Sequence, residues 1–89
     1  MKAILSVIGK DRVGIIARVS GYLQGIGVNI EDISQTVLQD YFAMIMLADI
    51  SAATVKFDKI AADLDAMGRE MGLGIRLQHE DLFNAMNRI

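Results

Sequence analysis

The residues best suited to bind a ligand lie in a glycine-containing turn at the start of an expected helix. The turn reads Gly9-Lys10-Asp11-Arg12-Val13-Gly14-Ile15. Free backbone N–H groups in the first turn of a helix, with the positive end of the helix dipole behind them, favour an anion such as a carboxylate. Because Gly14 lacks a Cβ, a ligand can come close to the backbone there. These residues predict a site for a small carboxylate, and a glycine turn with an ordinary helix cap is the structural alternative.

Asn29, at the start of the expected second strand, supplies a second set of polar contacts. Its side chain offers one carbonyl acceptor and one amide donor. With a carboxylate held at the helix start, an ammonium group shared by Asp11 and Asn29 would complete the recognition of a free amino acid. We therefore expect the turn and Asn29 to act together.

Hydrophobic spacing predicts the elements that position these residues. Residues 3–8 are rich in strand-forming side chains. Apolar side chains at helical spacing predict an amphipathic helix over residues 12–24, with Asp11 as its N-cap and Gly25-Ile26-Gly27 as its end. Residues 28–39 return to strand spacing, and a change of phase near Glu31-Asp32 predicts a β-bulge.

The second half of the chain repeats the pattern of strand, helix and strand. Gln39-Asp40 predicts a tight turn into a strand over residues 41–50, which pairs antiparallel with the strand before it. Thr54 is expected to cap a helix with a narrow apolar stripe over residues 57–71. Residues 75–79 are typical of a short last strand.

The order βαββαβ predicts an α+β fold, the ferredoxin-like sandwich. Right-handed crossovers place both helices on one face of a four-stranded antiparallel sheet. Residues 81–89 are expected to add a short C-terminal helical segment, and the 89 residues form a single domain over 1–89.

This fold leaves one sheet face uncovered, and that face is expected to be apolar. An open antiparallel face is ordinarily polar, yet the two central strands carry apolar side chains on both faces. The 53% hydrophobic composition is therefore interpreted as that of a homodimer in which a second copy, the C-terminal segment or both cover this face. The residues assigned to the interface are Ile4, Ile8, Phe42, Met44 and Met46 of the sheet, with Leu82, Phe83 and Met86 of the C-terminal segment.

The turn over residues 9–17, followed by Gly27-Val28-Asn29-Ile30, resembles the signature of the ACT domain, and the resemblance covers essentially the whole chain. The stretches over 32–36 and 78–86 resemble more narrowly the small, largely uncharacterised proteins that consist of one ACT domain. The chain is also similar to the ACT modules of the glycine-cleavage repressor and of formyltetrahydrofolate deformylase.

The resemblance implies a non-catalytic regulatory module that binds an amino acid or similar ligand near the interface of a dimer. No second domain accompanies the module, so it would signal to a separate, unidentified partner protein. Val13 stands where many ACT domains have proline. Carried over by position, the implied ligand contacts are Asp11, Arg12, Val13, Gly14, Ile15, Asn29 and Ile30.

Composition argues against several other classes of protein. The chain has no cysteine, and His79 is its only histidine, so neither a metal site nor a cofactor is expected. The formal net charge of −2 argues against a nucleic-acid partner. The longest apolar run, Tyr41 to Ala48, is far shorter than the roughly 20 residues of a membrane span. The N-terminus lacks the features of a signal peptide, so we expect a cytoplasmic protein with no membrane partner.

Three rival functions use the same fold. A pure protein-interaction or dimerisation module would need no ligand at all. An acylphosphatase-like enzyme would hold an anion at the same turn, and Lys10, Arg12 and Asn29 are suitable residue types, but no acid–base pair is apparent. An RNA-binding sheet needs exposed aromatics on its central strands, whereas Tyr41 and Phe42 are adjacent and therefore lie on opposite faces.

Overall fold

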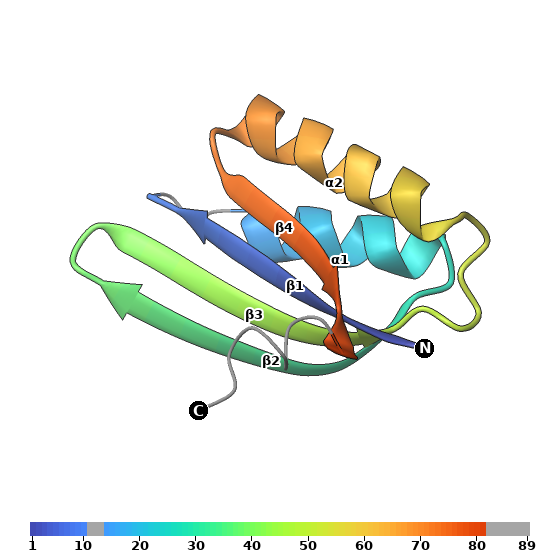
Figure 1. Ribbon diagram of the computed structural model, residues 1–89. Helices are drawn as coiled ribbons and strands as arrows, with labels where there is room; N and C mark the ends of the chain where they lie inside the picture. Colours follow the sequence, from blue (N-terminus) through green and yellow to red (C-terminus); the bar gives the residue numbers. More distant parts are fainter. Residues whose placement is uncertain (11–13, 82–89) are drawn as a thin grey trace.

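Four strands and two helices follow one another in the order expected from the sequence. The computed structural model describes residues 1–10 and 14–81, and Figure 1 shows the arrangement. The elements are β1 (Lys2–Gly9), α1 (Ile15–Gly25), β2 (Asn29–Leu38), β3 (Tyr41–Asp49), α2 (Phe57–Met71) and β4 (Gly74–His79). The ferredoxin-like α+β fold is confirmed.

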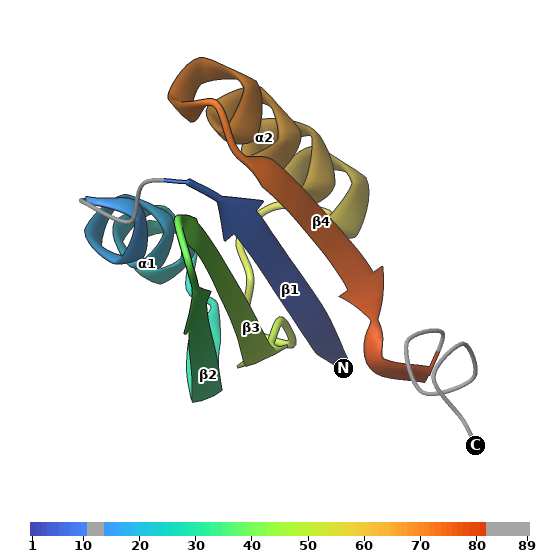
Figure 2. The same cartoon turned by 90° about the vertical axis from the view of Figure 1, so that its left-hand side faces the viewer.

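The sheet is antiparallel, with strand order β2-β3-β1-β4. Both helices lie on the same side of it (Figure 2). The pairing of β2 with β3 shifts register between Ile30 and Asp32, which confirms the predicted β-bulge. Because of this shift, Ile30 and Ile33 both pair with residues on the helix-covered face, Ala48 and Met46.

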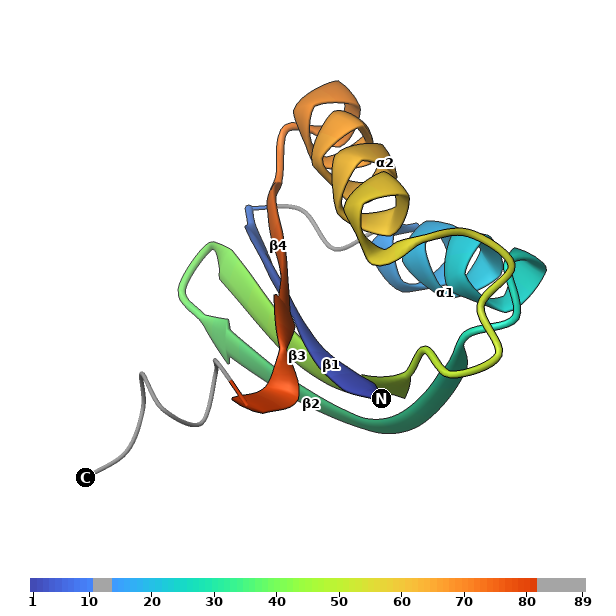
Figure 3. The same ribbon diagram turned by 45° about the vertical axis from the view of Figure 1, so that its right-hand side comes forward.

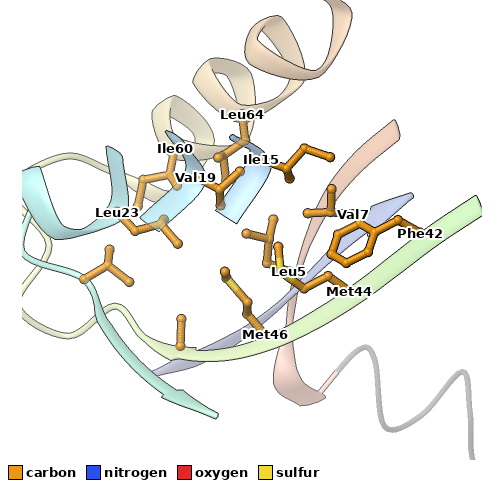
Figure 4. Close-up of a cluster of buried hydrophobic side chains, with 12 residues drawn as sticks. Leu5, Val7, Ile15, Val19, Leu23, Phe42, Met44, Met46, Ile60 and Leu64 are labelled. Carbon is orange, nitrogen blue, oxygen red and sulfur yellow. The ribbon is translucent and has the colours of Figure 1, made fainter. Parts of the chain in front are cut away.

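The core lies between the sheet and the two helices, as Figure 4 shows. The helices contribute the side chains expected from their apolar stripes, with Ile15, Val19 and Leu23 of α1 and Ile60 and Leu64 of α2 all buried. Alternate residues of β1 and β3, on the sheet face that the helices cover, complete the cluster: Leu5, Val7, Phe42, Met44, Met46 and Ala48.

The orientation of β3 is opposite to the one expected from the sequence. Phe42, Met44 and Met46 are at most 1% exposed and pack beneath the helices, so their assignment to the open face and to a dimer interface is wrong. The even-numbered and the odd-numbered residues of β3 are both apolar, so alternation alone could not decide which of the two sets faces the helices. Ile45 is 44% exposed and lies on the opposite face.

Two other assigned interface residues, Ile4 and Ile8, do lie on the open face, because they pair with Leu47 and Ala43 of β3. Ile8 is 56% exposed, whereas Ile4 is only 8% exposed. Their role in an interface stays a prediction. Leu82, Phe83 and Met86 lie outside the described residues.

Both helices begin later than expected. The N-cap of α1 is Gly14, so the prediction of Asp11 is wrong, and the N-cap of α2 is Lys56 rather than Thr54. Thr54 instead donates its N–H to the carbonyl of Ile26 at 2.8 Å and thereby ties the loop before α2 to the end of α1. No helix in the described part of the chain is long and apolar enough to cross a membrane.

Candidate functional site

The start of α1 presents an open set of backbone donors. Arg18 makes the first intrahelical hydrogen bond, to the carbonyl of Gly14 at 3.0 Å. The N–H groups of Ile15, Ile16 and Ala17 precede that bond and have no acceptor within the helix. Gly14 has no side chain to cap them, and no acidic residue lies in the first turn of α1.

The backbone conformation at position 14 favours glycine. Its φ is 75°, in the left-handed region, which costs glycine little and other residues about 1–2 kcal/mol. Among the described residues other than its chain neighbours, no atom lies within 4 Å of a Cβ built on Gly14. That space would let a ligand approach the helix start, and a ligand site there stays a prediction.

Lys10 adds positive charge at the same end of the sheet. Its Nζ lies 5.7 Å from the centre of the Tyr41 ring, within the range of a cation–π contact. Asp11, Arg12 and Val13, three of the predicted ligand contacts, lie outside the described residues.

Asn29 and Ile30 begin β2, and Figure 1 shows that β2 begins at the other end of the sheet from the start of α1. Asn29 pairs with Asp49, which pairs with Lys2 at the beginning of β1, whereas the turn into α1 follows Gly9 at its end. The two ends of β1 are separated by roughly 23 Å. Within one copy of the chain, Asn29 therefore lies far from Gly9, where the turn into α1 begins, and Asp11 lies outside the described residues. The crossover through α1 returns the chain to the end where β1 began, which sequence spacing does not reveal.

Asn29 and Ile30 instead line a separate pocket of about 230 Å³. Its other walls are Ser20 and Gln24 of α1 and Val28. Sequence reasoning did not identify Ser20 or Gln24 as part of a site. Their i, i+4 spacing places the two side chains next to each other on one face of a helix. This spacing could have indicated from the sequence that they lie together.

A larger polar cavity of about 370 Å³ lies near the N-terminus, lined by Met1, Lys2, His79, Glu80 and Asp81. Glu31 accepts a hydrogen bond from Lys2 at 2.7 Å, and this contact raises the pKa of Lys2. The His79 ring stacks on Phe57, with ring centres 4.0 Å apart. Among the described residues, no cluster of His, Asp and Glu side chains has the number needed to hold a metal ion.

Polar contacts between the helices hold α1 in place. Tyr22 donates a hydrogen bond to Asp63 at 2.6 Å, and Arg18 pairs with Glu70 at 2.8 Å. Burial, followed by the contact with Asp63, raises the pKa of Tyr22. Hydrogen bonds from Lys59 and from Tyr22 lower the pKa of Asp63. These contacts set the position of the helix whose first turn forms the open site.

Comparison with known proteins agrees with the fold and with the sequence resemblance. The family model for the ACT domain matches residues 2–78. A UPF0237 protein of Clostridium acetobutylicum is 55% identical over 89 residues, which is 100% of both chains. An ACT domain protein from Streptococcus pneumoniae superposes with a TM-score of 0.81 at 41% identity, covering 93% of each chain.

A putative glycine cleavage system transcriptional repressor has the same fold, with a TM-score of 0.75 at 22% identity over 86% of this chain and 44% of that one. ACT domains commonly bind small-molecule ligands and form dimers. The resemblance identified from residues 9–17 and 27–30 is confirmed. From its sequence and its fold together, the chain belongs to the ACT-domain family.

Proposed function

We propose that this protein is a non-catalytic regulator that binds an amino acid, or a similar small carboxylate, at the start of α1. The observation that carries the proposal is the first turn of α1, which has no side-chain cap and begins at Gly14, where a built Cβ meets no atom of the described residues within 4 Å. A ligand carboxylate would accept hydrogen bonds from Ile15 and Ile16 and interact favourably with the helix dipole. Lys10 adds positive charge near the site.

The remaining ligand contacts of this proposal are Asp11, Arg12 and Val13 from the turn. Asp11 carries the charge that an amino-acid ammonium requires, and Arg12 carries the charge that suits a second carboxylate or a polar ligand side chain. A repressor of glycine cleavage, which shares the fold, acts in amino-acid metabolism according to its name. That name supports an amino acid as the ligand class.

Asn29 and Ile30 enter the site from a second copy of the chain. β2 is an edge strand, and an edge strand offers unpaired backbone groups to another strand. Antiparallel pairing of two β2 strands would bring the Asn29 end of one copy beside the Val37 end of the other, where β1 leads into α1. Ile33 and Val37, which are 38% and 54% exposed, would gain apolar contacts there.

Regulation follows from this arrangement because the ligand touches two copies. The two states are a homodimer paired through β2 and a form in which the β2 edges are free. A ligand that contacts the helix start of one copy and Asn29 of the other binds only the paired state well, and it shifts the equilibrium by that difference in affinity. A separate partner protein that recognises one state, in the cytoplasm, would report the ligand concentration.

Calorimetric titration with each of the twenty amino acids tests the proposal. A ligand at a hundred times its Kd increases the free energy of unfolding by about 2.7 kcal/mol. Thermal denaturation should then show a Tm that is higher by roughly 10 °C or more for a domain of this size. Gly14→Val should abolish binding, because the side chain fills the open space and strains the backbone. Gly21→Val is the matched control, since Gly21 lies in α1 and also has open space around it. Asn29→Ala should weaken binding.

Two other results would replace this proposal. If no amino acid binds and Gly14→Val changes no assayed property, the chain is a pure interaction and dimerisation module. Turnover of an acyl phosphate that Arg12→Ala abolishes would instead support the acylphosphatase-like alternative.

A further inference from the structure

A pocket of about 230 Å³ lies between the second half of α1 and the start of β2. Figure 3 follows the chain from the end of α1 into the start of β2. The N–H of Val28 donates to the carbonyl of Leu23 at 2.9 Å, so these two segments are held together. We call this the α1–β2 pocket, and its lining residues are Ser20, Gln24, Val28, Asn29 and Ile30.

The α1–β2 pocket combines apolar side chains with uncharged polar ones. Val28 is buried and Ile30 is half-buried. Ser20 and Gln24 lie next to each other on one face of α1. Among the described residues, neither of these two side chains makes a hydrogen bond or an ion pair. The hydroxyl of Ser20 and the carboxamide of Gln24 are therefore both available to donate to a ligand and to accept from it.

We propose that Ser20 and Gln24 select the ligand by its side chain, and that this side chain is uncharged and ends in a carboxamide, as in glutamine or asparagine. The assignment rests on the proposed function, because the carboxylate of the same ligand is held at the start of α1 in a second copy. Ser20 and Gln24 are positions that determine specificity, whereas the first turn of α1 provides the general affinity for a carboxylate.

One copy of the chain is too long along α1 to supply both ends of this site. Gly14 and Gln24 are ten residues apart, which is about 15 Å along a helix. Four C–C bonds separate the carboxylate and carboxamide carbons of glutamine, which gives a span of roughly 5 Å. A ligand held at the helix start therefore does not reach Gln24 of the same copy.

Pairing of two β2 edges brings the two ends together. Antiparallel pairing of identical strands has a two-fold axis perpendicular to the sheet, which keeps both α1 helices on the same side. The Asn29 end of one copy then lies beside the Val37 end of the other, where β1 leads into α1. The start of α1 in one copy therefore lies at the same end of the joined sheet as the α1–β2 pocket of its partner.

A carboxamide matches the α1–β2 pocket in charge, hydrogen bonding and size. None of the described residues that line the pocket is charged, so a charged ligand side chain would lose hydration without gaining a counter-charge. An apolar side chain would cover Ser20 and Gln24 without bonding to them, which is also unfavourable. The pocket volume equals that of about eight water molecules in bulk, more than the hydroxymethyl group of serine would fill.

Calorimetric titration with glutamine, glutamate and methionine tests the assignment, because these side chains are similar in length and differ in charge and hydrogen bonding. The wild-type protein should bind glutamine at least roughly tenfold more tightly than the other two. Gln24→Leu should remove the preference over methionine, and Gln24→Lys should shift the preference to glutamate. Ser20→Ala should weaken glutamine binding. Ala62→Lys adds the same charge to an exposed residue of α2 and should leave the preference unchanged.

A mixture of two defective variants tests whether the two ends of the site come from different copies. Gly14→Val alters the helix start and Gln24→Lys alters the α1–β2 pocket, so neither variant alone should bind glutamine. Mixed in equal amounts until the copies exchange, they should regain about one quarter of the wild-type number of sites, because half of the pairs are mixed and each mixed pair has one intact site.

The outcomes distinguish this assignment from the proposed function. If Gly14→Val abolishes amino-acid binding but the Gln24 variants keep the wild-type preference, the carboxylate site stands and the role of Ser20 and Gln24 is wrong. A mixture that binds no glutamine would overturn the two-copy site. If the wild-type protein binds no amino acid at all, both the proposed function and the assignment of Ser20 and Gln24 fail.

Discussion

The hydroxyl of Tyr22 on α1 donates a 2.6 Å hydrogen bond to Oδ2 of Asp63 on α2. The two residues are 41 positions apart in the chain, and their contact joins the helices above the sheet. Lys59 also donates to Asp63, at 2.8 Å, so the carboxylate bridges a tyrosine and a lysine. This bridge holds α1, and with it the helix start at Gly14, in a defined position over the sheet.

Tyr22→Phe should destabilise the protein by about 1 kcal/mol, the usual contribution of such a hydrogen bond. For a domain of this size the Tm should fall by roughly 4–8 °C, measured by thermal denaturation. Tyr41→Phe is the control, because Tyr41 is exposed and its ring remains available to Lys10. Equal losses in the two variants would show that the contact with Asp63 contributes nothing.

The raised pKa of Tyr22 predicts a loss of stability at alkaline pH. The folded protein holds this proton more tightly than the unfolded chain, whose tyrosines titrate near pH 10. The stabilisation is thus fully present below about pH 10 and declines as the pH rises above that value. In Tyr41→Phe, Tyr22 is the only tyrosine. Ultraviolet titration of that folded variant should show ionisation well above pH 10, and a midpoint at 10 would contradict the burial of Tyr22.

The orientation of β3 predicts opposite sensitivities for two neighbouring residues. Met46 is fully buried under the helices, so Met46→Ala should cost about 2–5 kcal/mol through lost contacts and a cavity. Ile45 is 44% exposed on the open face, so Ile45→Ala should cost less than about 1 kcal/mol in the dissociated chain. Urea denaturation at low protein concentration measures both. The reverse ranking would mean that the strand faces the other way.

Gly27 should tolerate no side chain, whereas Gly21 should benefit from one. Gly27 has a φ of 81°, and a Cβ there would lie 2.7 Å from the carbonyl oxygen of Ala52. Gly27→Ala should therefore destabilise the protein by about 2 kcal/mol or more. Gly21 lies within α1 with open space around it, so Gly21→Ala should stabilise by about 0.5–1 kcal/mol. Chemical denaturation of both variants gives the comparison, and similar effects would refute it.

Much of the local structure could be predicted because neighbouring residues cause it. Helical and strand spacing predicted all six elements, and the phase change near Glu31 predicted the bulge that the register shift confirms. Gly25-Ile26-Gly27 marked the end of the first helix, where Gly27 adopts a positive φ. The helix starts were placed less well. Asp11 and Thr54 are good capping residues by type, but Gly14 and Lys56 hold the cap positions.

The residues of the candidate site were only partly placed together. Gly14 and Ile15 lie at the start of α1, whereas Asn29 lies at the far end of the sheet, and the ligand contacts themselves stay a prediction. Position in the sequence placed Asn29 at the head of the second strand, which is correct. It could not show that β3 separates β2 from β1, or that the head of β2 lies at the same end of the sheet as the beginning of β1, because both depend on the path of the chain across the sheet.

The sequence by itself determined the order of elements, the ACT family and the presence of an apolar surplus in the sheet. Only the tertiary structure decided which half of that surplus is core and which is surface. A period of two shows which residues share a face, but the covered face is chosen by the packing of all strands against both helices. That packing buries Met44 and Met46 and leaves Ile8 and Ile45 exposed, because β3 pairs with β1 in the register that joins Leu5 and Val7 to the two methionines.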